Sequence, residues 1–125
     1  MEMQKISTNK APAAIGPYSQ AIKYGNILFT SGQIPINPET GNVEAKTIAE
    51  QTEQVMKNLG AVLTAAGSGY DKAIKTTCFL AEIADFAAFN EVYAKYFTTC
   101  PARSCVAVKD LPKGVLVEVE VIASV

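Results

Sequence analysis

The segment Val115–Ser124 alternates apolar and polar residues with a period of two, and this alternation constrains the fold more than any other feature of the chain. Successive side chains of a strand point to opposite faces of a sheet. One face of this strand therefore carries Val115, Val117, Val119, Val121 and Ala123. The other face carries Leu116, Glu118, Glu120 and Ile122. The valine face must be covered by other elements, whereas the half-apolar face suits a partly buried surface such as a subunit interface.

Two amphipathic segments predict the helices that cover the valine face. Thr47 and Glu50 have the spacing of a capping box. Apolar residues then recur at helical spacing until Gly67 and Gly69 end the helix. Gly60 interrupts this helix at a penalty of about 1 kcal/mol relative to Ala, for which a close helix–sheet contact is one reason.

In the second helical segment, Asp85 is placed as the N-cap and Pro101 follows the helix. An aromatic stripe at helical spacing is expected to be part of the core, and Asn90 falls outside it. The stripe consists of Phe86, Phe89, Tyr93 and Phe97.

Four further strands are predicted, in addition to the one at 115–124. Ser19–Lys23 and Ile27–Ser31 flank Gly25-Asn26 and indicate a hairpin. Ala73–Leu80 and Arg103–Lys109 are the others. The element order ββ–α–β–α–ββ predicts an α+β fold, a single domain over residues 1–125, with a mixed sheet and both helices on one face.

Composition excludes several function classes. The 125 residues carry a net charge of −1, and no run of Lys or Arg is longer than one residue, so a nucleic-acid partner is not expected. There is no His, which removes the commonest general base and zinc ligand. Charged residues make up 18%, against about 25% in a typical domain, and this shortage hints at an oligomer.

The three cysteines, Cys78, Cys100 and Cys105, form no CxxC motif. An odd number of cysteines, together with an N-terminal stretch that lacks an apolar core, leads us to expect a reduced, cytoplasmic chain that does not enter a membrane. We expect no metal site.

The most informative segment for chemistry contains Arg103 and Cys105. If Val106 and Val108 face the core, Arg103 shares the outer face with Glu118 and Glu120. A hairpin with a four-residue loop, Asp110–Lys113, would place Arg103 opposite Glu120 and Cys105 opposite Glu118, and a slip of two residues would pair Arg103 with Glu118. Such a cluster is either an anion site with a water-activating acid or an ordinary cross-strand ion pair.

Two turn segments are weaker candidates. Gly16-Pro-Tyr-Ser19 can place the Tyr18 hydroxyl over a ligand, and Thr30-Ser-Gly-Gln33 can offer the backbone N–H groups of Ser31 and Gly32 to an anion. Taken alone, the first is equally a packing aromatic and the second an ordinary turn.

Three ordered motifs give a specific resemblance. They are Ala11–Ala21 (APAAIGPYSQA), Phe29–Pro35 (FTSGQIP), and Pro101–Val106 (PARSCV) followed by Leu111-Pro112 and Val117–Glu120. Over nearly its whole length the chain resembles the RidA (YjgF-type) family of reactive-imine deaminases. The one departure is Val119, where Ile or Met is usual, and it has no chemical consequence.

The resemblance implies a chorismate-mutase-like fold of the bacillus type, with three subunits forming a barrel and active sites between subunits. It implies hydrolysis of 2-iminopropanoate and 2-iminobutanoate, which pyridoxal-phosphate-dependent dehydratases release, to 2-oxo acids and ammonia, with no cofactor. By the family pattern, Arg103 grips the substrate carboxylate and Cys105 and Glu118 hold or activate water. Tyr18, Ser31 and Gly32 line the pocket, joined by Asn90.

Two other functions stay open at this point. Some family members are associated with RNA cleavage and translation inhibition, although the missing His disfavours a conventional ribonuclease. The chain could also be a non-catalytic, small-molecule-binding or chaperone-like trimer. The residues do not decide which of Glu118 and Glu120 assists the water.

Overall fold

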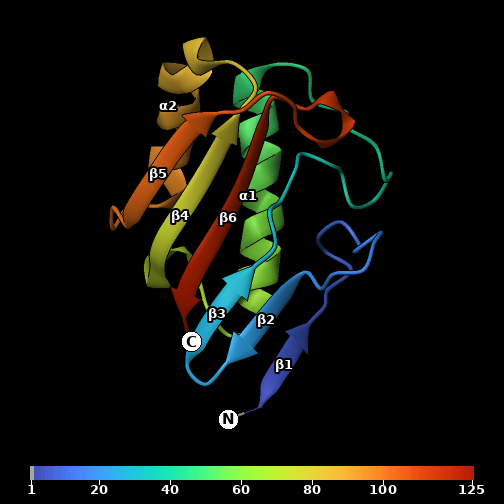
Figure 1. Cartoon of the computed structure of the whole chain (residues 1–125), viewed down its shortest axis with the longest axis vertical. Coiled ribbons are helices and arrows are strands. Elements are labelled where there is room, and N and C mark those ends of the chain that lie inside the picture. The colour runs from blue at the N-terminus through green and yellow to red at the C-terminus, as the bar shows by residue number, and fades with distance from the viewer. Residues whose placement is uncertain (1) are drawn as a thin grey trace.

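Residues 2–125 are described by a computed structural model, in which one six-stranded sheet carries both α-helices on the same face (Figure 1). The strands are β1 (Met3–Ile6), β2 (Ala21–Tyr24), β3 (Ile27–Thr30), β4 (Ala73–Leu80), β5 (Ala102–Ala107) and β6 (Val117–Ser124). The helices are α1 (Ile48–Ala65) and α2 (Phe86–Tyr96). The strand order is β1-β2-β3-β6-β4-β5, and only β4 and β5 pair in parallel. The predicted α+β class with a mixed sheet is confirmed.

The valine face of β6 is the centre of the core. All five of its residues, from Val115 to Ala123, are no more than 2% exposed. The four within β6, Val117, Val119, Val121 and Ala123, pack in one cluster with the apolar face of α1, which includes the fully buried Val55, Leu59 and Val62. The alternation in the sequence therefore predicted both the strand and the side that the helices cover.

Local signals set the ends of several elements. The Thr47 hydroxyl accepts a hydrogen bond from the Glu50 N–H at 3.1 Å, and the Glu50 carboxylate accepts one from the Thr47 N–H at 3.3 Å, which is the predicted capping box. In the β2–β3 hairpin, Tyr24 pairs with Ile27 across Gly25 and Asn26. Gly25 has a φ of 63°, which glycine adopts without strain. The short strand β1 was not predicted; it pairs with β2 at the edge of the sheet.

The predicted hairpin between the Arg103 strand and the last strand is wrong. Strand β4 lies between them, paired in parallel with β5 and antiparallel with β6. The two strands therefore run antiparallel to each other without touching, as a split hairpin. The burial assumed for β5 is also reversed, because Val106 is 45% exposed while Arg103 and Cys105 lie on the helix side, beside the buried Thr76 and Cys78. Inserting β4 gives the apolar β6 a neighbour on each side.

Gly60 in α1 is explained by a side chain rather than by the sheet. The Tyr70 hydroxyl donates a 2.6 Å hydrogen bond to the Met56 carbonyl, so the ring lies across the helix at Gly60. A Cβ at position 60 would collide with the Tyr70 hydroxyl. This close approach requires glycine in spite of its poor helix propensity.

We expect Gly60→Ala to lower the melting temperature, because the collision with Tyr70 outweighs the gain in helix propensity of about 1 kcal/mol. Thermal unfolding followed by circular dichroism measures the change. Thr64→Ala, at an exposed position of the same helix, is the matched control and should not destabilise. A Gly60→Ala protein that melts higher than wild type would contradict this explanation.

Candidate functional site

Arg103 is the only arginine of the chain, and it is held without a carboxylate partner. Its guanidinium Nη1 donates a 2.7 Å hydrogen bond to the Asn90 side-chain oxygen. The guanidinium carbon lies 4.9 Å from the Tyr93 ring centre and 5.4 Å from that of Phe86. No carboxylate of residues 2–125 forms an ion pair with it. A half-buried cation held this way retains donors for an anionic ligand.

The cradle around Arg103 comes from one face of α2. Phe86, Asn90 and Tyr93 are four and three residues apart, so they share a helix face. The prediction that the whole aromatic stripe is core is correct for Phe89, Tyr93 and Phe97, which are buried. It is wrong for Phe86, which is 37% exposed and stacks on the guanidinium. The spacing of these three residues was visible in the sequence, but the sequence did not show that β5 lies beneath them.

Cys105 lies next to this cradle, two residues along the same face of β5 and opposite Cys78. Burial raises the pKa of the Cys105 thiol, and the nearby Arg103 opposes this shift only in part. Cys105 is therefore a neutral thiol at pH 7, without a base beside it. This environment favours a packing or water-contacting role over nucleophilic attack.

A second group of predicted site residues gathers where β3 continues alongside β6. Phe29 pairs with Ile122, whereas Gln33 bridges to Val119, so the register shifts by one residue between them. The Thr30 hydroxyl compensates by accepting a hydrogen bond from the Val121 N–H at 2.9 Å. This irregularity brings the Ser31-Gly32 backbone beside Glu118.

Glu118 packs directly over Gly32. A Cβ at position 32 would collide with the Glu118 carboxylate, so only glycine lets the acid lie in this place. The pKa of Glu118 is raised, mainly by burial and further by the negative charge of Glu120 two residues away. A carboxylate with a raised pKa is a stronger base than an exposed one.

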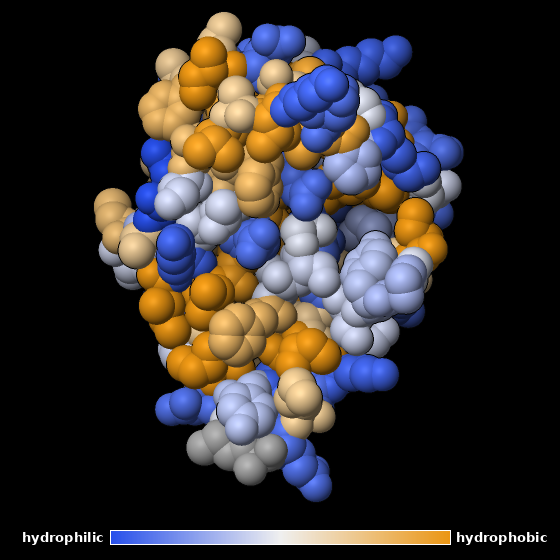
Figure 2. Space-filling view, in the orientation of Figure 1, coloured by the Kyte–Doolittle hydropathy of each residue, from blue (hydrophilic) through white to orange (hydrophobic). Residues whose placement is uncertain are grey.

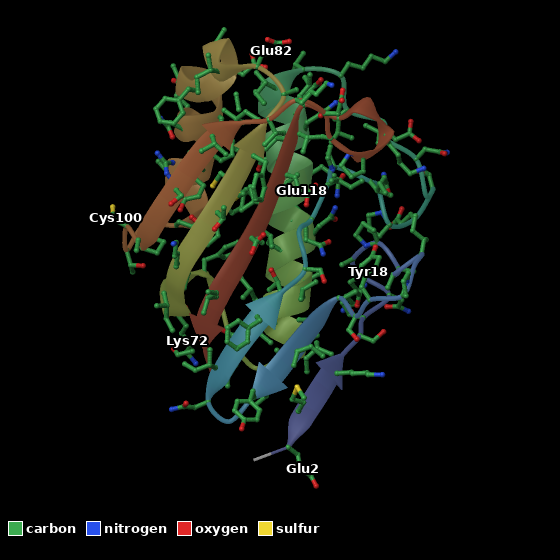
Figure 3. All side chains as sticks on the ribbon, in the orientation of Figure 1. Glu2, Tyr18, Lys72, Glu82, Cys100 and Glu118 are labelled. Carbon is green, nitrogen blue, oxygen red and sulfur yellow. The ribbon has the colours of Figure 1, made fainter. Side chains whose placement is uncertain are left out.

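A cavity of about 450 Å³ opens beside Glu118. Its floor includes Ser31 and Gly32, and one wall is the segment before β2 that carries Tyr18, which is half-exposed. In Figure 3, Glu118 lies on β6 on the side of the sheet away from α1, with Tyr18 across from it on that segment. Residues that sequence reasoning did not assign complete the lining, most of them apolar: Pro12, Ala13, Ile15, Ile34, Ile36, Pro112 and Lys113, with Gln33.

The predicted site residues therefore fall into two groups rather than one. Arg103, Asn90 and Cys105 lie on the helix side of the sheet, whereas Glu118 shares the open face with Phe79 and Val106. Arg103 does not line the cavity beside Glu118; a separate one of about 470 Å³ adjoins Arg103. The predicted common face of Arg103 with Glu118 and Glu120 is thus wrong, because the register through β4 aligns Arg103 with Thr76 and Val121, which face the helices.

The open face of the sheet is partly apolar. Phe29 and Val106 are each 45% exposed, and Figure 2 shows apolar residues gathered over the lower part of this face. Within residues 2–125, no three side chains of the His, Cys, Asp and Glu types gather as metal ligands would. No helix in the same range is long and apolar enough to cross a membrane.

The domain thus has an arginine without an ion-pair partner on one face of its sheet and a half-buried acid on the other. Over nearly its whole length, the chain is similar to known proteins. A family model described as endoribonuclease L-PSP matches residues 8–125. The RutC family protein y4sK of Sinorhizobium fredii is 52% identical over 98% of both chains. The 2-iminobutanoate/2-iminopropanoate deaminase of Escherichia coli is 49% identical over 94% of both chains.

Solved structures agree. YyfA of Yersinia pestis, a protein of unknown function of the Rid family, superposes with a TM-score of 0.96 at 53% identity, covering 99% of this chain and 100% of that one. Escherichia coli TdcF with bound serine gives a TM-score of 0.92 at 43% identity, covering 98% of each chain. The chain therefore belongs to the endoribonuclease L-PSP family, which includes the RutC and Rid proteins, and the resemblance to RidA is confirmed.

Because the pKa of Glu118 is raised, replacing this residue with a neutral one should stabilise the fold by an amount that depends on pH. The folded protein holds the proton more tightly than the unfolded chain, so the ionised carboxylate destabilises the fold at neutral pH, and this effect vanishes below the unfolded pKa of about 4.3. We expect Glu118→Gln to raise the melting temperature at pH 7 and to lose that advantage near pH 4. Calorimetry across this range, with the exposed Glu82→Gln as control, measures the difference. An unchanged or lowered melting temperature at pH 7 would contradict the shift.

Proposed function

We propose that this protein hydrolyses reactive 2-imino acids, such as 2-iminopropanoate and 2-iminobutanoate, to 2-oxo acids and ammonia. The observation that carries the proposal is Arg103, a half-buried guanidinium without an anionic partner, oriented by Asn90 and two aromatic rings. A planar carboxylate is the ligand that a forked guanidinium binds best. The names of close relatives point the same way, one as an imine deaminase and another as a protein with serine bound.

The chemistry of a 2-imino acid fits an anion site beside an acid. A 2-imino acid has its carboxylate on the carbon of the C=N bond, and serine likewise has its carboxylate and nitrogen on one carbon. Protonated on nitrogen, the C=N carbon is strongly electrophilic. The protein then needs to fix the carboxylate, hold a water beside that carbon and manage protons. None of these steps requires His, which the chain lacks.

Glu118 is assigned the proton transfers. As a carboxylate, it accepts a proton from the water while the water oxygen forms a bond to the iminium carbon and the C=N π electrons move to nitrogen. The protonated Glu118 then delivers that proton to the amino nitrogen. The C–N bond then breaks with its electron pair going to nitrogen, while the hydroxyl oxygen forms C=O and passes its proton to the Glu118 carboxylate. Glu118 hands that proton to the departing ammonia, so 2-oxo acid and ammonium leave and the carboxylate is restored. Its raised pKa suits this exchange, and general acid–base help of this kind contributes about 10²–10⁴-fold. Glu120 is assigned an indirect role, raising the pKa of Glu118.

A second copy of the chain must supply the missing half of the site. Arg103 and Glu118 lie on opposite sides of one sheet, so a single chain does not bring them to one substrate. The partly apolar open face offers a surface for association. We assign the homotrimer that the family resemblance implies, with Arg103, Asn90 and Cys105 from one subunit facing Tyr18, Ser31, Gly32 and Glu118 from the next.

Arg103→Ala should abolish nearly all imine hydrolysis while the oligomer survives. Loss of the group that pairs with a buried charge typically weakens binding by about 2–5 kcal/mol. Arg103→Lys should also be poor, since a point charge does not reproduce the fork. The assay couples a threonine dehydratase to this protein and follows the rate of 2-oxobutanoate formation.

Lys109→Ala, an exposed cation beyond the end of β5, is the matched control and should keep full activity. A wild-type protein that does not accelerate 2-oxobutanoate formation over the spontaneous rate would refute the proposal. Incubation of nuclease-free wild type and Arg103→Ala with RNA tests the alternative, which cleavage by both proteins would favour. Full function of both Arg103→Ala and Glu118→Ala would favour a non-catalytic binding trimer.

The shared site predicts complementation between two inactive variants. When Arg103→Ala and Glu118→Ala chains are co-expressed with different tags, interfaces that combine the intact Glu118 of one with the intact Arg103 of the other are complete. Random mixing makes about one quarter of all sites complete. Purification on both tags removes the trimers of a single variant, and each remaining trimer has one complete site of three, so we expect about a third of wild-type activity in the doubly purified mixture. Activity no higher than in either variant alone would place both residues in one subunit's site.

A further inference from the structure

Gln20, immediately before β2, uses its side chain as a backbone partner. The residue is 3% exposed. Its Nε2 donates to the carbonyls of Thr8 at 3.0 Å and Pro12 at 2.7 Å, and a third carbonyl, that of Ala11, lies 3.4 Å away. Its Oε1 accepts from the Thr8 N–H at 2.7 Å. Both amide hydrogens and the amide oxygen are therefore committed to one short segment of backbone.

These bonds take over where sheet pairing stops. β1 pairs with β2 only as far as Ile6 opposite Ala21. Beyond that point, the Gln20 carboxamide binds both the N–H and the C=O of Thr8, as the backbone of a neighbouring strand would. A side-chain carboxamide has the same donor and acceptor groups as a peptide, so it can extend the pairing.

The segment held in this way, residues 8–18, is called the strap here. It supplies the wall of the cavity beside Glu118 through Pro12, Ala13, Ile15 and Tyr18. From position 13 to 18 all its residues are exposed, and the bond from the Tyr18 N–H to the Gly16 carbonyl, 2.8 Å, stays within the strap. The buried Ala11 and the Gln20 carboxamide are thus what fasten the strap to the body of the protein.

Gln20 also holds the floor of the same cavity. Its backbone carbonyl accepts a 2.9 Å hydrogen bond from the Ser31 N–H, and the Ser31 hydroxyl donates to the Ser19 carbonyl at 2.5 Å. Ser31 precedes Gly32, which carries Glu118 above it. One residue therefore links the apolar wall to the floor on which the acid lies.

We propose that Gln20 is a positioning residue that fixes the strap against the Glu118 cavity and thereby sets the preference for the side chain of the substrate. The part concerning substrates rests on the proposed deaminase function. With the strap in place, a longer apolar side chain meets Pro12, Ala13 and Ile15 instead of water. An added methylene in an apolar pocket changes kcat/KM by about 10-fold or more.

The test compares wild type with Gln20→Met, which keeps the length of the side chain and removes every hydrogen bond that the side chain makes. Amide hydrogen exchange is measured by NMR at Thr8 and Ser31. Loss of the bond to Gln20 should speed exchange at Thr8 by about tenfold, whereas Ser31, bonded to the Gln20 backbone, stays protected. The role of Gln20 in fixing the strap would be overturned if the Thr8 amide were equally protected in both proteins, or if Thr8 and Ser31 lost protection equally. Neither result depends on any enzymatic activity.

Activity supplies the second measurement. Imines of alanine, 2-aminobutyrate and norvaline are generated by an amino-acid oxidase, and kcat/KM is obtained for each. We expect kcat/KM to rise with chain length in wild type and to become nearly flat in Gln20→Met. Gln20→Asn, too short to reach the strap, should behave like Gln20→Met and guards against an effect peculiar to methionine.

Tyr70→Phe is the matched control, because it removes a part-buried hydrogen bond to the Met56 carbonyl, and neither Tyr70 nor Met56 lines the cavity beside Glu118. It should leave the chain-length preference unchanged even if it melts lower. The same flattening in Tyr70→Phe, or an unchanged preference in Gln20→Met, would overturn the positioning role. Absence of imine hydrolysis in wild type would instead refute the proposed function and leave the exchange result standing.

Discussion

The insertion of β4 between β5 and β6 is the constraint on which the rest of the molecule depends. It gives β6 a paired strand on each side, and the valine face of β6 is buried in the cluster that includes the apolar face of α1. The register of the two pairings that β4 makes fixes which face each chemical group occupies. Arg103 is directed toward α2, and Glu118 toward the open face. The placement of β4 and the register of its two pairings therefore determine both the neighbours of the core strand and the separation of the two charged groups.

Both charged groups are kept in environments that a stable fold alone does not require. The Arg103 guanidinium is half-buried against Tyr93 and Phe86 and bonded to a neutral amide instead of a carboxylate. Glu118 is half-buried beside another acid, with no cation paired to it among residues 2–125. Burying charge without a partner costs free energy. Neither arrangement is explained by the stability of one chain, whereas the proposed roles, anion binding at Arg103 and proton transfer at Glu118, would account for both.

Features that depend on local periodicity were predicted from the sequence, and those that depend on strand order were not. The alternation in β6, the capping box at Thr47 and the turn at Gly25 each report on neighbours within a few residues, and each is confirmed. The position of β5 depends on which strand pairs with β6, and β4 takes that place. The short connection between β5 and β6 in the sequence wrongly favoured a hairpin. The resemblance supplied the candidate site residues, but their division between two faces emerged only from the strand pairing. The role of Gln20 was invisible because a carboxamide that replaces a peptide leaves no periodic signal.

The cavity beside Glu118 shows how a sheet provides a site without a dedicated loop of its own. The register shift after Phe29 frees the Ser31 and Gly32 backbone from regular pairing, and the missing Cβ of Gly32 leaves room for a carboxylate. The strap then closes one side because the Gln20 carboxamide carries sheet-like bonding beyond the end of β1. In both places a side chain makes hydrogen bonds that the backbone of a regular sheet would make. The Thr30 hydroxyl replaces a backbone acceptor, and the Gln20 carboxamide replaces a neighbouring strand. The sheet thereby fixes Glu118 opposite the strap, which hydrogen bonds hold at both of its ends. This arrangement is the preorganisation that the proposed activation of water requires.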